Sequence, residues 1–255
     1  MIKAPFAKEE LLSKLNGIKT EHSDPDLNVR LLFAPKKLSG KTVDEFCSLY
    51  SRIMGESFES VVIVESRLGE AKKKLPMPSF KSIETPYGEV LVNDKLRNDF
   101  ADEDDDFFID DDAFGQDVSI FDQLLLLQSV LEDFSVLSIQ ITDENSFIVK
   151  ELAYALEEVL ASRNILIVFC CDLDALYSDE LREVVNHIKT DNFSALLNYL
   201  NGGKSNVDGV GTFVAGLIVA QKWGLTLDFD LLNGRPVSNA LSGYAHLQPQ
   251  YNHRK

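Results

Sequence analysis

Residues able to do chemistry gather at the end of one apolar segment. Cys170 and Cys171 close the run at residues 164–171, and Asp172 follows directly. A thiolate is a nucleophile, but the run contains no histidine that could activate either thiol. In a strand the two thiols would point to opposite faces. We interpret both cysteines as small buried residues, with a nucleophile as the alternative, and Asp172 as a turn cap rather than a ligand-binding carboxylate.

Metal-ligand spacings are absent from the sequence. None of the four histidines has a partner two, three or four residues away, so no metal-binding pair is predicted. The three cysteines, Cys47, Cys170 and Cys171, fit reduced thiols of a cytoplasmic protein better than a disulfide framework. Phosphate-binding loops are also missing, because Gly209-Val210-Gly211 lacks the further glycine and lysine of the known fingerprints. We therefore predict no metal and no cofactor.

The charge of the chain is strongly negative and locally concentrated. The formal net charge is −16, and residues 99–112 carry acids without a single base. Such a balance argues against nucleic acid, because a polyanion would be repelled. We interpret residues 99–112 as an exposed acidic loop. They lack the calcium-loop spacing of an EF-hand, and docking on a basic protein is the alternative.

Membrane insertion is not predicted. The longest apolar run, at residues 165–171, is far shorter than the roughly 20 residues that span a bilayer. The first residues carry frequent charges and no apolar secretory core, so we expect a cytoplasmic protein without a membrane partner.

Hydrophobic patterns alternate between strands and helices along the chain. The predicted strands include residues 29–33, 60–64, 136–141, 164–171 and 225–231. The predicted helices include residues 8–15, 42–54, 119–131, 145–162 and 209–223. This order indicates a layered α/β fold with a largely buried central sheet and helices on both faces. Unbroken apolar character places residues 61–64 and 165–171 in central strands. No linker divides the sequence, so residues 1–255 are predicted to form a single domain, with a tail at residues 251–255.

A series of short motifs occurs in the order of one family's pattern. They are Ala34-Pro35-Lys36, Glu65-Ser66-Arg67-Leu68-Gly69, Glu84-Thr85-Pro86-Tyr87-Gly88, Asp112-Ala113-Phe114, Cys170-Cys171-Asp172-Leu173, Asp208-Gly209-Val210-Gly211 and Gly243-Tyr244-Ala245. Over about residues 28–248 the chain thereby resembles the Memo family, the B component of the AmmeMemoRadiSam system. The resemblance implies a fold like that of class III extradiol dioxygenases. It also implies a pocket at the strand ends that holds a metal on two histidines and a cysteine.

The departures from that pattern fall on the family's ligands. The resemblance places Lys36, Leu68 or Gly69, and Asp208 at the three ligand positions. The other family histidines correspond to Phe114, Val118 and Ala175. Leucine and glycine offer no donor and a lysine ammonium repels a cation, so a metal-free site is predicted. The candidate pocket residues are Lys36, Asp117, Asp172, Asp208, Cys170 and Cys171.

Two functional hypotheses follow for such a site. The preferred one is a non-catalytic Memo-like protein that binds or scaffolds protein partners, with a homo-oligomer as a further option. The alternative is an enzyme with a rebuilt, metal-independent pocket around Lys36, Asp117, Asp172 and Asp208. If the family fold is kept, Lys36 Nζ should lie within about 4 Å of the Asp208 carboxylate, because the two charges would compensate each other. Without such compensation, Lys36 would extend into solvent.

Overall fold

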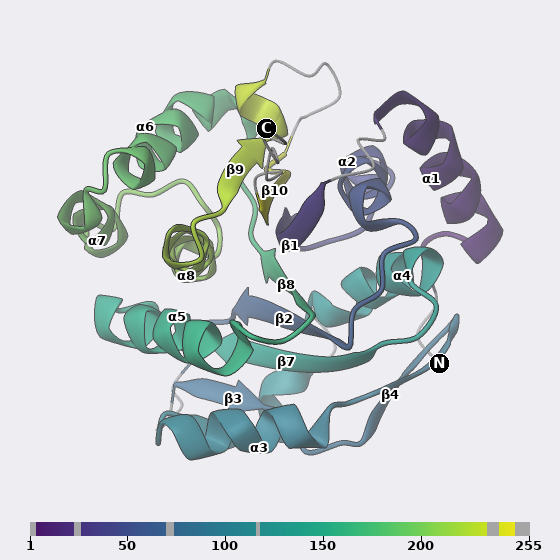
Figure 1. The fold of residues 1–255 in the computed structure, drawn as a ribbon, viewed down its shortest axis with the longest axis horizontal. Coiled ribbons are helices and arrows are strands. Elements are labelled where there is room, and N and C mark those ends of the chain that lie inside the picture. Colours follow the sequence, from purple (N-terminus) through teal and green to yellow (C-terminus); the bar gives the residue numbers. More distant parts are fainter. Residues whose placement is uncertain (1–3, 23–26, 70–73, 116–117, 234–239, 248–255) are drawn as a thin grey trace, which may run out of the picture.

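A six-stranded sheet forms the centre of the computed structural model, which describes residues 4–22, 27–69, 74–115, 118–233 and 240–247. The strand order is β7-β2-β8-β1-β10-β9 (Figure 1). Their bounds are β1 (Asn28–Ala34), β2 (Ser60–Ser66), β7 (Ser135–Ile141), β8 (Ile165–Cys170), β9 (Thr226–Phe229) and β10 (Gly243–Leu247). Strands β7, β2, β8 and β1 are parallel, and β10 runs antiparallel to both β1 and β9. The carboxyl ends of the four parallel strands therefore meet at one edge.

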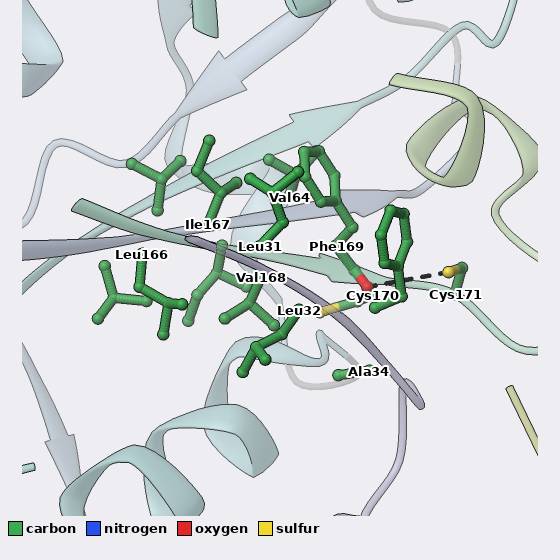
Figure 2. Packing of buried hydrophobic residues seen from close by; sticks show 14 of the residues in the cluster. Leu31, Leu32, Ala34, Val64, Leu166, Ile167, Val168, Phe169, Cys170 and Cys171 are labelled. Atoms are coloured by element: carbon green, nitrogen blue, oxygen red, sulfur yellow. Dashed lines mark hydrogen bonds between the residues drawn. The ribbon is translucent and has the colours of Figure 1, made fainter. Parts of the chain in front are cut away.

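The two strands predicted to be central are confirmed as central. Every residue of β2 and β8 is buried, and each strand lies between two others. Figure 2 shows the apolar side chains of β8 packed with those of β1 and β2. A strand buried on both faces requires a continuous apolar sequence, and residues 61–64 and 165–169 provide it.

Helices cover both faces of the sheet, as predicted. One side carries α1 (Lys8–His22), α2 (Val43–Tyr50) and α4 (Ile120–Val130), and the other carries α5 (Ser146–Leu160) and α8 (Val210–Lys222) (Figure 1). Helices α6 (Ser178–Lys189) and α7 (Phe193–Asn201) pack beside α8. Among the described residues, no helix is both long and apolar enough to cross a membrane.

The acidic region at residues 99–112 is not a loop, and that prediction was wrong. It contains the end of α3 (Asp94–Glu103), the short strand β6 (Phe107–Ile109) paired with β3 (Leu75–Met77), and a 3-10 helix at Asp111–Phe114. Buried Leu96, Phe100 and Phe107 anchor the region, with the rings of Phe100 and Phe107 5.2 Å apart. The helical spacing of Leu96 and Phe100 and the packing of Phe107 against Phe100 decide the structure. Most of the acids face solvent.

A second small element is the turn at Thr85-Pro86-Tyr87-Gly88, which belongs to one of the family motifs. It joins β4 (Ser82–Thr85) to β5 (Gly88–Leu91) as an antiparallel hairpin. Gly88 has a φ of 122°, a backbone conformation that disfavours any residue with a Cβ atom.

Candidate functional site

Polar side chains collect where the parallel strands end. Gln140 of β7, Glu65 of β2, Cys170 of β8 and Ala34 of β1 are register partners across the sheet. Residues paired in this way project to the same face of a sheet. The row therefore places a buried carboxylate and a buried amide beside the loop that begins after Ala34.

Lys36 and Asp208 form the ion pair that the sequence predicted. The Lys36 Nζ atom lies 3.1 Å from Oδ1 and 3.2 Å from Oδ2 of Asp208. The lysine side chain is only 17% exposed, whereas the Asp208 side chain is 70% exposed. The Asp208 carboxylate therefore contacts the mostly buried Lys36 ammonium from the solvent side.

Asp172 joins the two partners through the backbone. Its Oδ1 atom accepts a hydrogen bond from the Lys36 backbone N–H at 3.2 Å. Its main chain forms an antiparallel bridge with Asp208, with N···O distances of 3.0 and 2.9 Å. Asp172 thus caps the turn after Ala34, in line with the structural role favoured from sequence, and it fixes the position of both charged residues.

The surrounding carboxylates keep Lys36 protonated. Burial alone would lower the pKa of its ammonium, but the hydrogen bond and charge of Asp208 outweigh burial, with help from Glu65 and Asp172, and the pKa is raised. The pKa of Asp172 is also raised, mainly because burial penalises its charged form. Lys36 is therefore a cation at neutral pH. It lies between Asp172, whose pKa is raised, and the exposed carboxylate of Asp208.

Sequence reasoning missed Glu65, which is one of the most buried acids of the site. Its carboxylate accepts hydrogen bonds from the Ser119 backbone N–H at 2.8 Å and from Ser119 Oγ at 2.5 Å. Ser119 precedes α4, so the positive end of the helix dipole faces this carboxylate. A single acid at the end of an apolar strand was the available signal, although its helix partner lies 54 residues away.

Helix α4 also holds the backbone of the Lys36 loop. Asp122 accepts a hydrogen bond from the Leu38 N–H at 2.9 Å, and Gln123 Nε2 donates to the Pro35 carbonyl at 2.8 Å. The Tyr50 hydroxyl donates to Gln123 Oε1 at 2.6 Å, which orients the amide. Burial raises the pKa of Asp122, even though the Leu38 hydrogen bond favours its charged form. Two neighbouring side chains of α4, Asp122 and Gln123, therefore hold the backbone of this loop.

The position of Thr42, three residues before Glu45, predicts that its side chain caps α2, and that prediction was wrong. Thr42 Oγ1 donates to the Lys37 carbonyl at 2.6 Å and accepts from the Ser39 N–H at 3.0 Å, so it does not cap α2. The Thr42 backbone N–H donates to the Ser39 carbonyl at 3.2 Å. The hydroxyl thus closes the turn that follows Lys36 and leaves the helix start to backbone bonds.

The segment carrying Asp208 is held from two sides. Gly209 has a φ of 85°, and a Cβ atom there would lie 3.2 Å from the Cys170 carbonyl oxygen. The Gly211 N–H donates to Glu144 Oε1 at 2.8 Å, and a Cβ atom on Gly211 would meet Glu144 Cγ at 2.7 Å. The two glycines therefore allow close packing. Glu144 occupies the amino end of α8, where an anion could otherwise bind.

Glu180 of α6 positions the chain just before Asp208. It accepts hydrogen bonds from the Tyr199 hydroxyl at 2.6 Å and from both the backbone and side chain of Asn206, at 2.9 and 2.7 Å. Although burial opposes its charged form, these bonds lower the pKa of Glu180. A fixed carboxylate thereby anchors residues 205–206 two residues ahead of Asp208.

Cys170 and Cys171 are fully buried free thiols. Burial raises the pKa of both well above the usual value, with further contributions from Glu65 at Cys170 and from Asp172 at Cys171. Cys170 lies in register with Glu65 on the α4 side, while Cys171 Cβ lies 3.6 Å from the Cβ position of Gly209 (Figure 2 labels both thiols). Neither is ionised for nucleophilic attack at neutral pH. The remaining candidate, Asp117, lies outside the described residues.

The fold and its polar strand ends define a layered α/β protein of the kind that places ligands at the carboxyl edge of its parallel sheet. A family model described as Memo-like protein matches residues 7–246, and the chain belongs to that family. The match begins upstream of the motifs at residue 28 and includes α1.

Comparison with solved structures supports the same fold. The crystal structure of an uncharacterized protein, JW3007 from Escherichia coli K12, aligns with a TM-score of 0.56 at 10% identity, covering 86% of this chain and 100% of that chain. At this identity the likeness concerns the fold alone. A search of curated proteins found no match.

The residues at the site do not fit the metal that the resemblance implies. Both Asp208 oxygens face the Lys36 ammonium, and Leu68, with its side chain 67% exposed, has no donor atom. Within the described parts of the chain, no group of three or more His, Cys, Asp or Glu side chains is placed to hold a metal ion. Transition metals of this kind require imidazole, thiolate or carboxylate donors together.

Removing Asp208 should strand the buried charge of Lys36. We expect Asp208→Ala to lower the free energy of unfolding by about 1 kcal/mol more than the Lys36→Met, Asp208→Ala double variant, after allowance for the exposure of Asp208. Urea unfolding of the four members of the cycle measures the difference. Asp179→Ala, in the exposed pair with Arg182, is the control and should change little. Equal losses in the single and double variants would show that the pair contributes nothing.

Proposed function

We propose that this member of the Memo-like family is a non-catalytic binding protein in which the Lys36–Asp208 ion pair takes the place of a bound metal. The supporting observation is the position of Lys36 Nζ, 3.1 and 3.2 Å from the two carboxylate oxygens of Asp208. A single ammonium supplies positive charge to a group of carboxylates that would otherwise be uncompensated. The charge balance of the site therefore needs no metal.

The protonation states of the site favour binding over catalysis. A lysine nucleophile must be unprotonated, but the carboxylates raise the pKa of Lys36. Burial keeps Cys170 and Cys171 as thiols, which are poor nucleophiles. The raised pKa of Asp172 suits acid–base chemistry, and it supports an enzyme as the second candidate.

We propose that the partner is a protein, which contacts the segment that follows β8. Leu176, in the 3-10 helix Ala175–Tyr177 after β8, is 87% exposed, and the neighbouring Tyr177 is also exposed. Large apolar side chains of this kind mark protein contacts when they lie beside charged groups. The partner is either a different protein or a second copy of this chain. The free, buried cysteines support a reducing compartment, and we place the protein in the cytoplasm.

Metal analysis tests the proposal directly. Protein purified without chelator and then dialysed is expected to contain well under one equivalent of iron, copper or zinc, because an ammonium stands among the donors. Elemental analysis by mass spectrometry gives the stoichiometry. Retention of one equivalent of metal after dialysis would refute the proposal and favour the enzyme.

A matched variant tests whether the ion pair stands at the family's ligand positions. Lys36→His, Leu68→His and Asp208→Cys together introduce two imidazoles and a thiolate at these positions. We expect this triple variant to take up about one equivalent of zinc, since three such ligands form an open site. Zinc uptake equal to that of the unmodified protein would place the ion pair away from the family's site.

A further inference from the structure

A second polar hollow lies beside the Lys36 site, on the other side of Glu65. It is enclosed by the ends of β2 and β7 and by the 3-10 helix Asp111–Phe114, and its volume is about 300 Å³. This volume is at the lower end of the range for small-molecule sites. Neither Lys36 nor Asp208 lines it. The hollow is therefore a candidate site separate from the Lys36–Asp208 pair.

The deepest polar group of the hollow has an unused acceptor. The side chain of Gln140 is fully buried, and its Nε2 atom donates to Glu65 Oε2 at 3.4 Å. Its Oε1 atom accepts no hydrogen bond within the described residues. Buried acceptors are almost always paired in folded proteins, so an unpaired one in a residue that lines a hollow indicates a missing donor. A bound molecule with an N–H group would supply it.

The mouth of the hollow carries charges of both signs. Arg67 follows β2, and its guanidinium nitrogens lie 3.7 and 3.8 Å from the Cβ position of Gly115. Asp110 and Asp112 come from the chain segment opposite β2. In the part of the chain that the structure describes, none of the three forms an ion pair. The Asp110 carboxylate also accepts a hydrogen bond from the Asp112 backbone N–H at 3.1 Å. One cation and two carboxylates that are not in ion pairs among the described residues complement a molecule that bears both charges.

We propose that this hollow binds a free amino acid, or a zwitterion of similar size, whose side chain carries a hydrogen-bond donor. Arg67 would hold the carboxylate through its planar fork of N–H groups. Asp110 and Asp112 would hold the ammonium, and Gln140 Oε1 would accept from the side chain. Leu68 and Pro76 supply an apolar wall for the aliphatic part. L-glutamine has all four features and is the probe.

Calorimetric titration of the full chain tests the assignment. L-glutamine is expected to bind more tightly than L-leucine, which lacks the side-chain donor. Putrescine and glutarate, each with charge of one sign only, should bind more weakly than either amino acid. The proposal is wrong if L-glutamine does not bind, or if it binds no better than putrescine and glutarate.

Two variants separate the site from incidental binding. Arg67→Met changes an exposed side chain, so the fold should be kept, and the loss of a charged hydrogen bond should weaken L-glutamine binding about tenfold or more. Gln140→Met should abolish the preference for L-glutamine over L-leucine. Arg182→Met, an exposed arginine of α6, is the matched control and should leave affinity unchanged. Should Gln140→Met fail to fold, the Arg67 comparison decides, and unchanged affinity in Arg67→Met would overturn the proposal.

Discussion

Replacing Gly216 with valine is expected to lower the free energy of unfolding by about 3 kcal/mol, because the side chain would overfill a closed core. Gly216 lies in α8 where the helix crosses β1 and β8. A Cβ atom there would meet Phe33 Cε1 at 2.5 Å and Phe169 Cδ2 at 2.8 Å. Both rings are fully buried and stacked on each other with centroids 5.6 Å apart, so neither can move without disturbing its neighbours.

A second helical glycine provides a control for which the expected change in stability has the opposite sign. Gly17 lies in α1 with nothing within 4 Å of its Cβ position. Gly17→Ala should raise stability by about 0.5 kcal/mol, because alanine restricts the unfolded chain and favours helix. Thermal and urea unfolding of both variants measure the two effects. If Gly216→Val is as stable as the unmodified protein, the close packing of α8 on the two strands is not what the structure indicates.

Replacing Glu65 with alanine should cost a similar amount, about 3 kcal/mol, for a different reason. The change leaves the Ser119 backbone N–H and hydroxyl at the start of α4 buried without an acceptor. It also leaves the Gln140 amide without its only hydrogen-bond partner among the described residues. Glu65→Gln keeps one acceptor oxygen, and we expect it to lose about half as much.

Glu84 of β4 is a suitable control for Glu65. It is exposed, and Glu84→Ala should change the free energy of unfolding by less than about 0.5 kcal/mol. Denaturant unfolding followed by circular dichroism compares the three variants. Equal stability of the Glu65→Ala and Glu84→Ala proteins would mean that the buried carboxylate does not support α4.

The sheet was predictable because its signals are local. Unbroken apolar runs in β2 and β8 predicted both strands and their central positions. Asn145 accepts from the N–H groups of Phe147 and Ile148 and starts α5 at the residue where the helix was predicted to begin. The structure of residues 99–112 does not follow from composition, because acids dominate that region. Two buried phenylalanines, Phe100 and Phe107, decide its structure through contacts that composition does not report.

The candidate site was predictable only where a family pattern supplied the long-range order. Lys36 and Asp208 are 172 residues apart, and no local rule pairs them. The resemblance gave the pair, and the structure has it. Glu65 begins one of the family motifs but was given no role there, Gln140 lies in none of them, and each looks like an isolated polar residue in a strand. Their importance arises from register across β2 and β7, which single-strand patterns do not fix.

The position of β1 within the sheet has a consequence for synthesis on the ribosome. Residues 28–34 are synthesised before both of their strand partners, which are residues 165–170 and 243–247. While the intervening chain is being translated, β1 has both of its hydrogen-bonding edges uncovered. Apolar strands in that condition are prone to pair with other chains. The two hydrogen-bonding edges of β1 are therefore covered only after β8 and then β10 have been synthesised.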